Sequence, residues 1–192
     1  DTWIDAGGTI AGIHAAVIQL NDGRLMALGR NENIDGNIPR SISIDKGKTW
    51  TYSASIFPPV SGGQRCLLLR LQEGPILFAG FAGDRKEPES MPMMLTDESG
   101  QQRPVTGLYT ALSYDEGETW SNIRLVSDDG PGIELETMDG RSFTMGFHSA
   151  EPGGYISMRQ AANGIIHLIS SRLHYAFNLV WLETPPPATV RK

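Results

Sequence analysis

One eight-residue pattern occurs twice in this chain and constrains its fold more than any other feature. Both copies fit S-x-D-x-G-x-T-W without insertion, and each lies between two alternating apolar runs. The pattern therefore predicts a turn between antiparallel strands, in which Asp accepts amide hydrogen bonds, Gly adopts a positive φ and Trp begins the next strand. The fixed positions are Ser43, Asp45, Gly47, Thr49 and Trp50 in the first copy and Ser113, Asp115, Gly117, Thr119 and Trp120 in the second.

Three hairpins with a similar turn organise the rest of the chain. Their turns lie at Asp22-Gly23, Glu73-Gly74 and Asn163-Gly164. Asp-Gly and Asn-Gly favour tight hairpin turns, and a third strand follows each hairpin. The first two units then add the repeated turn and a fourth strand. We predict an all-β fold of three propeller blades of four strands, in residues 11–57, 64–127 and 154–182.

The two ends of the chain depart from this pattern. Thr2-Trp3 matches the end of the repeated turn, so residues 3–10 are expected to form a spare outer strand. Residues 174–182 are expected to form a third strand, and the prolines at 185–187 cannot continue a ladder. Three blades are too few to close a propeller of about 4–8. The sequence thus predicts either a homodimer or a chain whose N-terminal half is missing.

Composition argues against several classes of protein. The net charge is −6 and no basic stretch is present, so nucleic acid is not an expected partner. No apolar stretch approaches the roughly 20 residues that span a bilayer, so no membrane partner is expected. The single cysteine, Cys66, is expected to be a small core residue. The four histidines lack ligand spacing, and we expect neither a metal nor a cofactor.

Two long connections indicate where binding takes place. Relative to the matching segments elsewhere, 19 extra residues fall around 84–106 and 20 around 127–154. Both connections emerge at the end of the units opposite the repeated turns, and long loops on a rigid scaffold commonly carry function. Arginines that converge there suit a carboxylate or sulfate. The candidates for substrate binding at this end are Arg30, Arg65, Arg85, Arg103, Arg172 and His174.

The repeated turn resembles the Asp box of sialidases and other BNR-repeat β-propellers, and the chain resembles the C-terminal half of a six-bladed sialidase. In that family, E-x-x-x-x-E-L-x-D-G-x-L with an Arg seven residues after the Gly carries a catalytic Glu and a carboxylate-binding Arg. Residues 14–25 have the same offsets, with His14 at the Glu position and Arg30 at the Arg position.

A second sialidase pattern, Y-S-x-M-x-x-L-x-D-G, carries the tyrosine nucleophile. Tyr155 lies nine residues before Gly164, as in that pattern, and takes the place of the nucleophile. Arg103 is the nearest match to a further family arginine, with Arg85 as its rival. The family's Arg-Ile-Pro and its acid/base Asp are not identifiable in this sequence.

The resemblance implies a sialidase-like glycoside hydrolase that acts on a glycan containing sialic or uronic acid. Tyr155 would be the nucleophile, His14 its base, and the arginines would hold the carboxylate. Because two catalytic positions depart from the family, a non-catalytic glycan-binding or assembly module is the alternative. A third hypothesis is a polysaccharide lyase that uses His14, His174 and Tyr175. The resemblance also implies a secreted or periplasmic protein.

Overall fold

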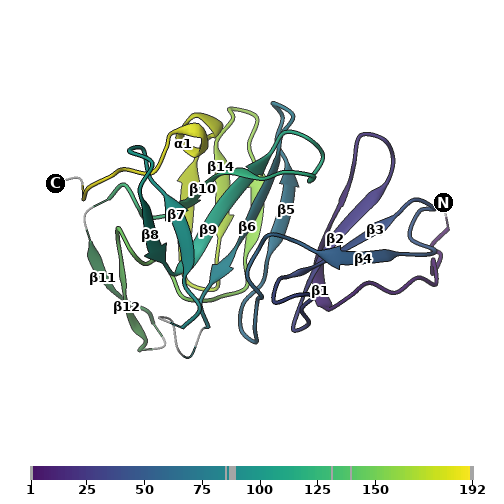
Figure 1. The fold of residues 1–192 in the computed structure, drawn as a ribbon, viewed down its shortest axis with the longest axis horizontal. Helices are drawn as coiled ribbons and strands as arrows, with labels where there is room; N and C mark the ends of the chain where they lie inside the picture. Colours follow the sequence, from purple (N-terminus) through teal and green to yellow (C-terminus); the bar gives the residue numbers. More distant parts are fainter. Residues whose placement is uncertain (1, 85, 87–89, 131, 139, 191–192) are drawn as a thin grey trace.

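Antiparallel β-structure dominates the computed structural model of this chain (Figure 1). In the described residues it forms three sheets, two separate hairpins and one short helix, α1 (Leu179–Glu183). The predicted all-β class is confirmed. The structure describes residues 2–84, 86, 90–130, 132–138 and 140–190.

The first two units are four-stranded meanders in which each strand pairs with the next one of its unit. The first sheet consists of β1 (Ile13–Gln19), β2 (Leu25–Arg30), β3 (Pro39–Ser43) and β4 (Thr51–Ala54). The second consists of β5 (Leu67–Arg70), β6 (Ile76–Ala82), β9 (Gly107–Ser113) and β10 (Ser121–Leu125). In both sheets the repeated turn joins the third and fourth strands, as predicted.

The third unit is a three-stranded sheet, and the two long connections fold into hairpins of their own. The sheet consists of β13 (Ser157–Gln160), β14 (Ile166–Ile169) and β15 (His174–Phe177). The connection around 84–106 contains β7 (Met93–Thr96) and β8 (Gln102–Val105), and that around 127–154 contains β11 (Ile133–Glu136) and β12 (Ser142–Met145). The extra residues are therefore partly ordered as β-ribbons rather than open loops.

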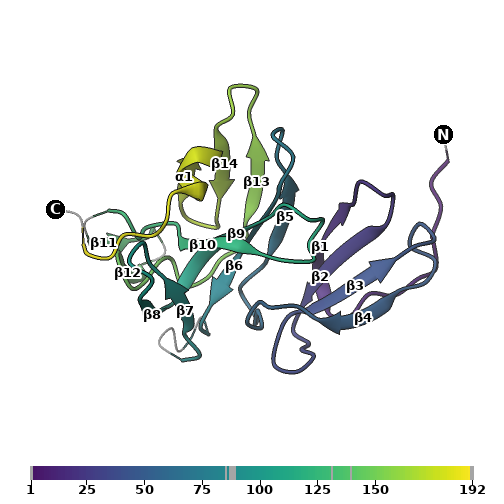
Figure 2. The same ribbon diagram turned by 45° about the horizontal axis from the view of Figure 1, so that its top comes forward.

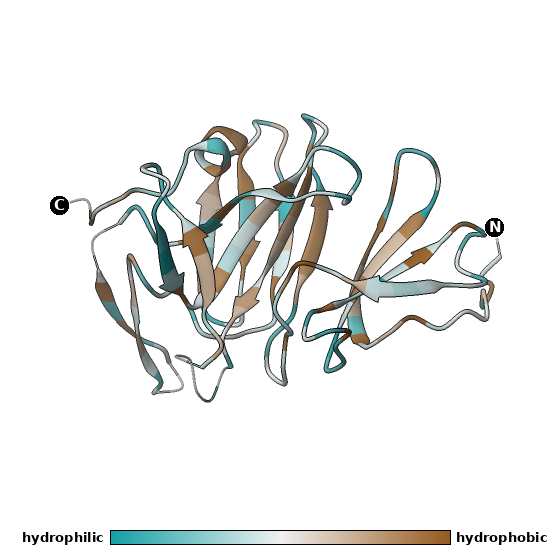
Figure 3. Ribbon diagram, in the orientation of Figure 1, coloured by the Kyte–Doolittle hydropathy of each residue, from teal (hydrophilic) through white to brown (hydrophobic). Residues whose placement is uncertain are grey.

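The second sheet lies between the other two. Its first strand, β5, contacts both β1 and β13, the first strands of the neighbouring sheets (Figure 2). Every residue of β6 and β9 is buried, whereas β1 and β13 keep exposed positions. Apolar residues lie on strands of all three sheets (Figure 3), and those of the second sheet include the buried side chains of β6 and β9. The main core is thus built on both faces of one sheet.

The two repeated turns have the same hydrogen bonds. In the first, the Ser43 hydroxyl donates to Asp45 at 2.9 Å and accepts from the Gly47 amide at 2.8 Å. Asp45 also accepts from the amide and the hydroxyl of Thr49, and these bonds lower its pKa to about 2. The second turn repeats all four bonds. The pattern acts as a self-contained turn whose Asp is fully engaged by its own loop.

The two ends of the chain differ from the strands expected there. Residues 3–10 form no strand within this single chain and are almost entirely exposed, and their predicted pairing with a second copy or a longer chain stays a prediction. The strand expected over 174–182 ends at Phe177, since Asn178 caps helix α1 by accepting a hydrogen bond from the Trp181 amide. The third sheet consequently has no fourth strand among the described residues.

Candidate functional site

The candidate site lies where four strands of three different units begin or end. Arg30 ends β2 and His14 is the second residue of β1. Arg65 lies two residues before β5, and Tyr155 lies two residues before β13. In the first sheet this is the end opposite the repeated turn, because β2 and β3 are antiparallel. The topology therefore brings together residues that are up to 141 positions apart in the sequence, from His14 to Tyr155.

Two guanidinium groups flank the ring of Tyr155. The Cζ atoms of Arg30 and Arg65 lie 5.4 and 4.8 Å from the ring centroid, within cation–π range. Arg30 Nη2 also donates a long hydrogen bond of 3.4 Å to the Tyr155 hydroxyl. Tyr155 itself is 49 % exposed, so part of the residue is accessible to a ligand from solvent. We call Arg30, Arg65, Tyr155 and His14 the arginine–tyrosine cluster.

A bulge in β1 directs His14 into this cluster. The register of β1 against β2 shifts between Ile13 and Ala16, and His14 has a φ of 50°, which is unusual for a residue other than glycine. Its Nδ1 lies 3.1 Å from Arg65 Nη2. Because arginine only donates, Nδ1 accepts this bond. His14 was predicted to be the base for Tyr155, but its hydrogen bond among the described residues is with Arg65.

The positive charge of the cluster is not neutralised. Among the described residues, no carboxylate lies within 4.0 Å of a nitrogen of Arg30 or Arg65. The Nε atoms of both side chains are buried without a hydrogen-bond partner. Arg30 is only 6 % exposed, and its Nη1 donates to the carbonyl oxygens of Ser61 and Gln64. Two held cations without a counter-ion form a site for an anion.

A buried amide, Gln64, fixes the walls of the site. Its side chain is inaccessible to solvent and donates from Nε2 to the carbonyl oxygens of Gly83 and Pro152, both at 2.9 Å. Its Oε1 accepts from the amide of Ser61 at 3.1 Å. Because its own carbonyl accepts from Arg30, one residue connects β2, the end of β6 and the segment that leads to Tyr155. Sequence reasoning missed Gln64, since a loop glutamine carries no signal of burial.

A depression of about 340 Å³ adjoins the cluster beside Arg30. Its polar lining consists of Asn31, Glu32, Asn33, Ser61 and Asp84, and its remaining lining of Pro59, Val60, Gly83 and Met91. Such amide and carboxylate side chains are suited to hydrogen bonds with sugar hydroxyl groups. The volume falls within the range of small-molecule sites, which is roughly 300–1,000 Å³.

A second polar cluster lies behind the segment that leads to Tyr155. Glu151 is inaccessible to solvent and accepts from Ser170 and Tyr175, both at 2.9 Å. Burial raises the pKa of Glu151 and also that of Tyr175. The Ser171 hydroxyl accepts from the amide of Tyr155 at 2.8 Å, so the turn between β14 and β15 holds the tyrosine in place.

The other predicted site residues have different positions. Arg103 donates to the carbonyl oxygens of Phe147 and Pro187, and no contact joins it to the arginine–tyrosine cluster. His174 Nε2 lies 3.0 Å from Nδ1 of His167 on the neighbouring strand. The structure thus provides no support for these two as partners of Arg30.

Arg172 and Arg85 complete the set of predicted substrate-binding residues. Arg172 donates to the carbonyl oxygen of Gly153 at 3.1 Å and lies 3.8 Å from the Glu151 carboxylate. It therefore supports the segment before Tyr155. Arg85 lies outside the described residues.

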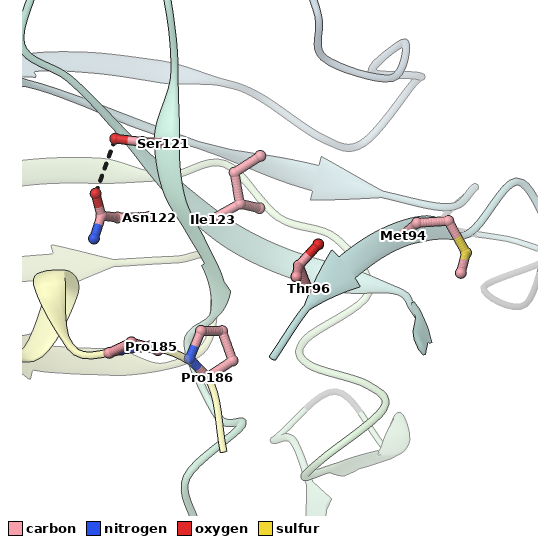
Figure 4. A pocket seen from close by; sticks show the side chains of 7 residues that line it. All are labelled: Met94, Thr96, Ser121, Asn122, Ile123, Pro185 and Pro186. Atoms are coloured by element: carbon pink, nitrogen blue, oxygen red, sulfur yellow. Dashed lines mark hydrogen bonds between the residues drawn. The ribbon is translucent and has the colours of Figure 1, made fainter. Parts of the chain in front are cut away.

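The remaining features of the described residues provide no further reactive or charged site. Cys66 is buried as predicted, and burial raises its pKa to about 11. No group of three or more His, Cys, Asp or Glu side chains there could hold a metal ion, and no helix has the length and apolarity of a membrane span. A depression between β7, β10 and the segment after α1 has no titratable lining residue (Figure 4); it is lined by Met94, Thr96, Ser121, Asn122, Ile123, Pro185 and Pro186.

Comparison with known proteins found structural neighbours of low similarity. No protein-family model and no curated protein matches the sequence. A protein of unknown function from Dyadobacter fermentans matches 85 % of this chain and 41 % of its own, with a TM-score of 0.34 and 16 % identity. A mannose phosphorylase from Leishmania mexicana, in complex with phosphate ion, matches 92 % of this chain and 56 % of its own, with a TM-score of 0.36 and 13 % identity. The chain thus spans 41 % and 56 % of these two proteins.

Proposed function

We propose that this chain is part of a sialidase-like glycoside hydrolase and that the arginine–tyrosine cluster binds the carboxylate of a sialic or uronic acid. One observation carries the proposal: Arg30 and Arg65 flank Tyr155, and no described carboxylate neutralises them. A planar carboxylate can accept two hydrogen bonds from a guanidinium, which fixes the orientation of the sugar as well as its position.

The neighbouring depression completes a binding site for one sugar ring. Its amide and carboxylate lining beside Arg30 would bind hydroxyl groups, while the two guanidinium groups bind the acid. The sialidase resemblance of His14, Arg30 and Tyr155 in the sequence agrees with this division, because the three residues come together in space.

In the proposed reaction, the Tyr155 oxygen attacks the anomeric carbon as the bond to the leaving-group oxygen breaks, and that oxygen takes up a proton from solvent. A water molecule then cleaves the glycosyl–tyrosine bond and restores the Tyr155 phenol. The phenol proton must pass to a base as the bond forms. His14 can accept it only when its Nδ1 gives up the bond to Arg65, since that nitrogen carries its available lone pair. Binding of an acid to Arg65 would release this nitrogen.

We also propose that the three sheets are blades of a sialidase-like β-propeller. The four-stranded meanders, the position of the repeated turns and the contacts of β5 with β1 and β13 support this arrangement. A closed propeller would then require blades from a second copy or from a longer chain.

Substitution of Tyr155 by Phe tests the proposed reaction. Turnover of a fluorogenic sialoside or uronide should fall at least about 10³-fold, as expected for loss of a nucleophile. The dissociation constant of N-acetylneuraminic acid, measured by calorimetry, should change less than about threefold, because both guanidinium groups remain. Purified chain that neither binds nor cleaves sialosides or uronides would refute the proposal.

A non-catalytic acidic-glycan-binding module is the second candidate. It is favoured by the surroundings of the Tyr155 hydroxyl, whose one hydrogen bond among the described residues comes from the donor Arg30. The wild-type chain would then bind N-acetylneuraminic acid or a uronic acid without cleaving any glycoside. The Tyr155→Phe variant would show the same binding and the same absence of turnover.

A further inference from the structure

We infer that a second copy of this chain supplies the fourth strand that the third sheet lacks, through its residues 2–7. The first two sheets each end in a fourth strand after the repeated turn, whereas the third ends at β15 among the described residues. The inference rests on the proposed propeller arrangement and deepens it by naming the source of the missing strand. It does not depend on the chemistry proposed for the arginine–tyrosine cluster.

The outer edge of β15 presents backbone groups that can pair with a further strand. The Ser170 amide donates to the Leu173 carbonyl oxygen at 2.9 Å, next to the turn between β14 and β15. Because bonded and non-bonded pairs alternate along an antiparallel ladder, Tyr175 bonds to β14, whereas His174 and Ala176 direct their N–H and C=O groups away from it. Among the described residues, nothing pairs with these outward groups. Such an edge can accept an extended segment by β-augmentation.

A depression of about 510 Å³ follows this edge. All of residues 174–178 line it, and successive residues of a strand point to opposite faces, so the depression lies along the edge of β15 and not over one face. Its apolar lining includes Val126, Ile165, Phe177 and Trp181. It therefore offers an extended segment both backbone partners and an apolar surface.

Residues 2–7 are available to fill this depression. They are exposed, with Trp3 at 88 % and Ile4 at 76 %, although both side chains are large and apolar. Among the described residues, their hydrogen bond is internal to the segment, from the Gly7 amide to Asp5 at 2.8 Å. Adjacent exposed apolar side chains on a segment without a partner favour binding to an apolar surface.

The first sheet predicts the register of the added strand. Ser43 pairs with Leu25, which lies two residues after its hairpin glycine. Phe177 pairs with Ile166, which also lies two residues after its hairpin glycine, so Phe177 takes the place of Ser43. The pairing of β3 with β4 places the tryptophan of the repeated turn opposite Ser43. An added strand in the same register has its tryptophan opposite Phe177.

Trp3 suits this position. Thr2-Trp3 repeats the Thr-Trp pair that precedes β4 and β10. Opposite Phe177, the Trp3 ring would lie on the buried side of β15, in the depression that Trp181 also lines. The equivalent residue of the second sheet, Trp120, packs edge-on against an aromatic ring in this way, with its centroid 5.0 Å from that of Phe57.

The segment comes from a second copy, because the same molecule cannot bring it to β15. The second sheet lies between the first and the third, and the N-terminus lies beyond the first sheet on the side away from α1 (Figures 1 and 2). Thr9 is held there, since its carbonyl oxygen accepts from the Tyr52 hydroxyl at 2.6 Å. Two copies related by a two-fold axis would exchange their segments reciprocally and cover both β15 edges.

Light scattering of the 192-residue chain tests the exchange, and the expected mass is twice the 20.9 kDa of one chain. Trp3→Asp should raise the dissociation constant of the dimer at least about 100-fold, because the two-fold exchange buries this side chain twice. The matched control is Ile44→Asp, which places the same charge at an apolar side chain of similar exposure, 82 %, on the first repeated turn and should leave the dimer intact. Thermal melts of both variants check the fold.

A cysteine pair tests the register. The predicted pairing places Ile4 of one copy opposite Ala176 of the other, within the Cα separation that a disulfide spans. The Ile4→Cys/Ala176→Cys variant should therefore form a covalent dimer on mild oxidation, which a non-reducing gel detects. Ile4→Cys alone is the control and should remain separable, since Cys66 is buried.

The outcomes distinguish this inference from the proposed function. A wild-type monomer refutes the exchange, and if that monomer binds N-acetylneuraminic acid the proposed function still stands. A dimer that Trp3→Asp does not weaken, or whose engineered cysteines stay reduced, is held by a different interface and also refutes the exchange. A dimer that shows the expected losses but binds no sialoside or uronide supports the exchange while the proposed function fails.

Discussion

Arg30 and Arg124 are both buried, yet their surroundings are opposite. Arg124 is 1 % exposed and donates a hydrogen bond to Asp128 at 2.6 Å. It also donates to the carbonyl oxygens of Trp181 and Thr184. Its guanidinium stacks on the Trp181 ring, with Cζ 3.6 Å from the ring centroid. Arg30 is 6 % exposed, donates to two carbonyl groups and has no carboxylate partner among the described residues.

The difference separates an arginine that stabilises the fold from one that serves a ligand. Arg124 and Asp128 neutralise each other, so together they join β10 to the end of α1 without attracting an anion. Arg30 retains an uncompensated charge beside a half-exposed tyrosine, which costs stability and becomes favourable when an anion binds. Burial alone therefore does not identify a functional arginine; Arg30 is distinguished by its missing counter-ion together with its position beside the ring of Tyr155.

Replacement of Arg124 by Met should cause the largest loss of stability among the variants proposed here. It leaves the Asp128 carboxylate buried without its partner, so the free energy of unfolding should fall by about 3–5 kcal/mol. Urea denaturation measures this change. The Arg124→Met/Asp128→Leu double variant should recover much of the loss, because it removes both charges. Equal destabilisation of the single and double variants would contradict the conclusion that Arg124 stabilises the fold by neutralising Asp128.

Replacement of Arg30 by Ala should affect binding more than folding. The variant loses charge-assisted hydrogen bonds of about 1.5–3 kcal/mol, so affinity for N-acetylneuraminic acid should fall about 10–100-fold in a calorimetric titration. Stability should fall less than in Arg124→Met, since no carboxylate is left behind. Arg30→Lys is the matched control: it keeps the charge but not the planar fork and should bind with intermediate affinity. Unchanged binding by Arg30→Ala would assign Arg30 to the fold.

The Glu151–Arg172 pair lies between these two cases, because its carboxylate is buried but its nearest arginine nitrogen is 3.8 Å away. Its contribution to stability depends on pH. Burial raises the pKa of Glu151 above its unfolded value, so the folded state holds this proton more tightly. Its contribution to stability is present below the unfolded pKa of about 4.5 and is lost as pH rises through the raised folded value. The free energy of unfolding cannot change with pH by more than the value for one titrating proton, which is about 1.4 kcal/mol per pH unit.

Urea denaturation of the wild-type chain and Glu151→Gln between pH 4 and 7 measures this linkage. The stability of the wild type relative to the variant should decline as pH rises, because glutamine keeps a hydrogen-bond acceptor but does not ionise. A pH-independent difference would show that Glu151 does not titrate across folding.

Much of the fold could be predicted from residues that act locally. The repeated turn and the Asp-Gly and Asn-Gly turns determine their own geometry through neighbouring amides and a glycine at positive φ, and each formed as expected. Arg30 lies at the end of β2 and Tyr155 lies two residues before β13, near the strand ends that the hairpin pattern predicts. Gln64 and Glu151 could not be predicted, because their roles depend on partners 88 and 24 residues away.

The sequence by itself determined most strands of the three sheets, the repeated turns, and the position of Arg30 at the end of its unit opposite the repeated turn. Those features follow from alternating apolar residues and from turn chemistry within a few positions. Only the tertiary structure decided that Arg65 joins Arg30 at Tyr155, that His14 contacts Arg65, and that Arg103 lies elsewhere. The reason is physical: a strand-end side chain finds its partner according to how separate sheets pack, which no local pattern encodes.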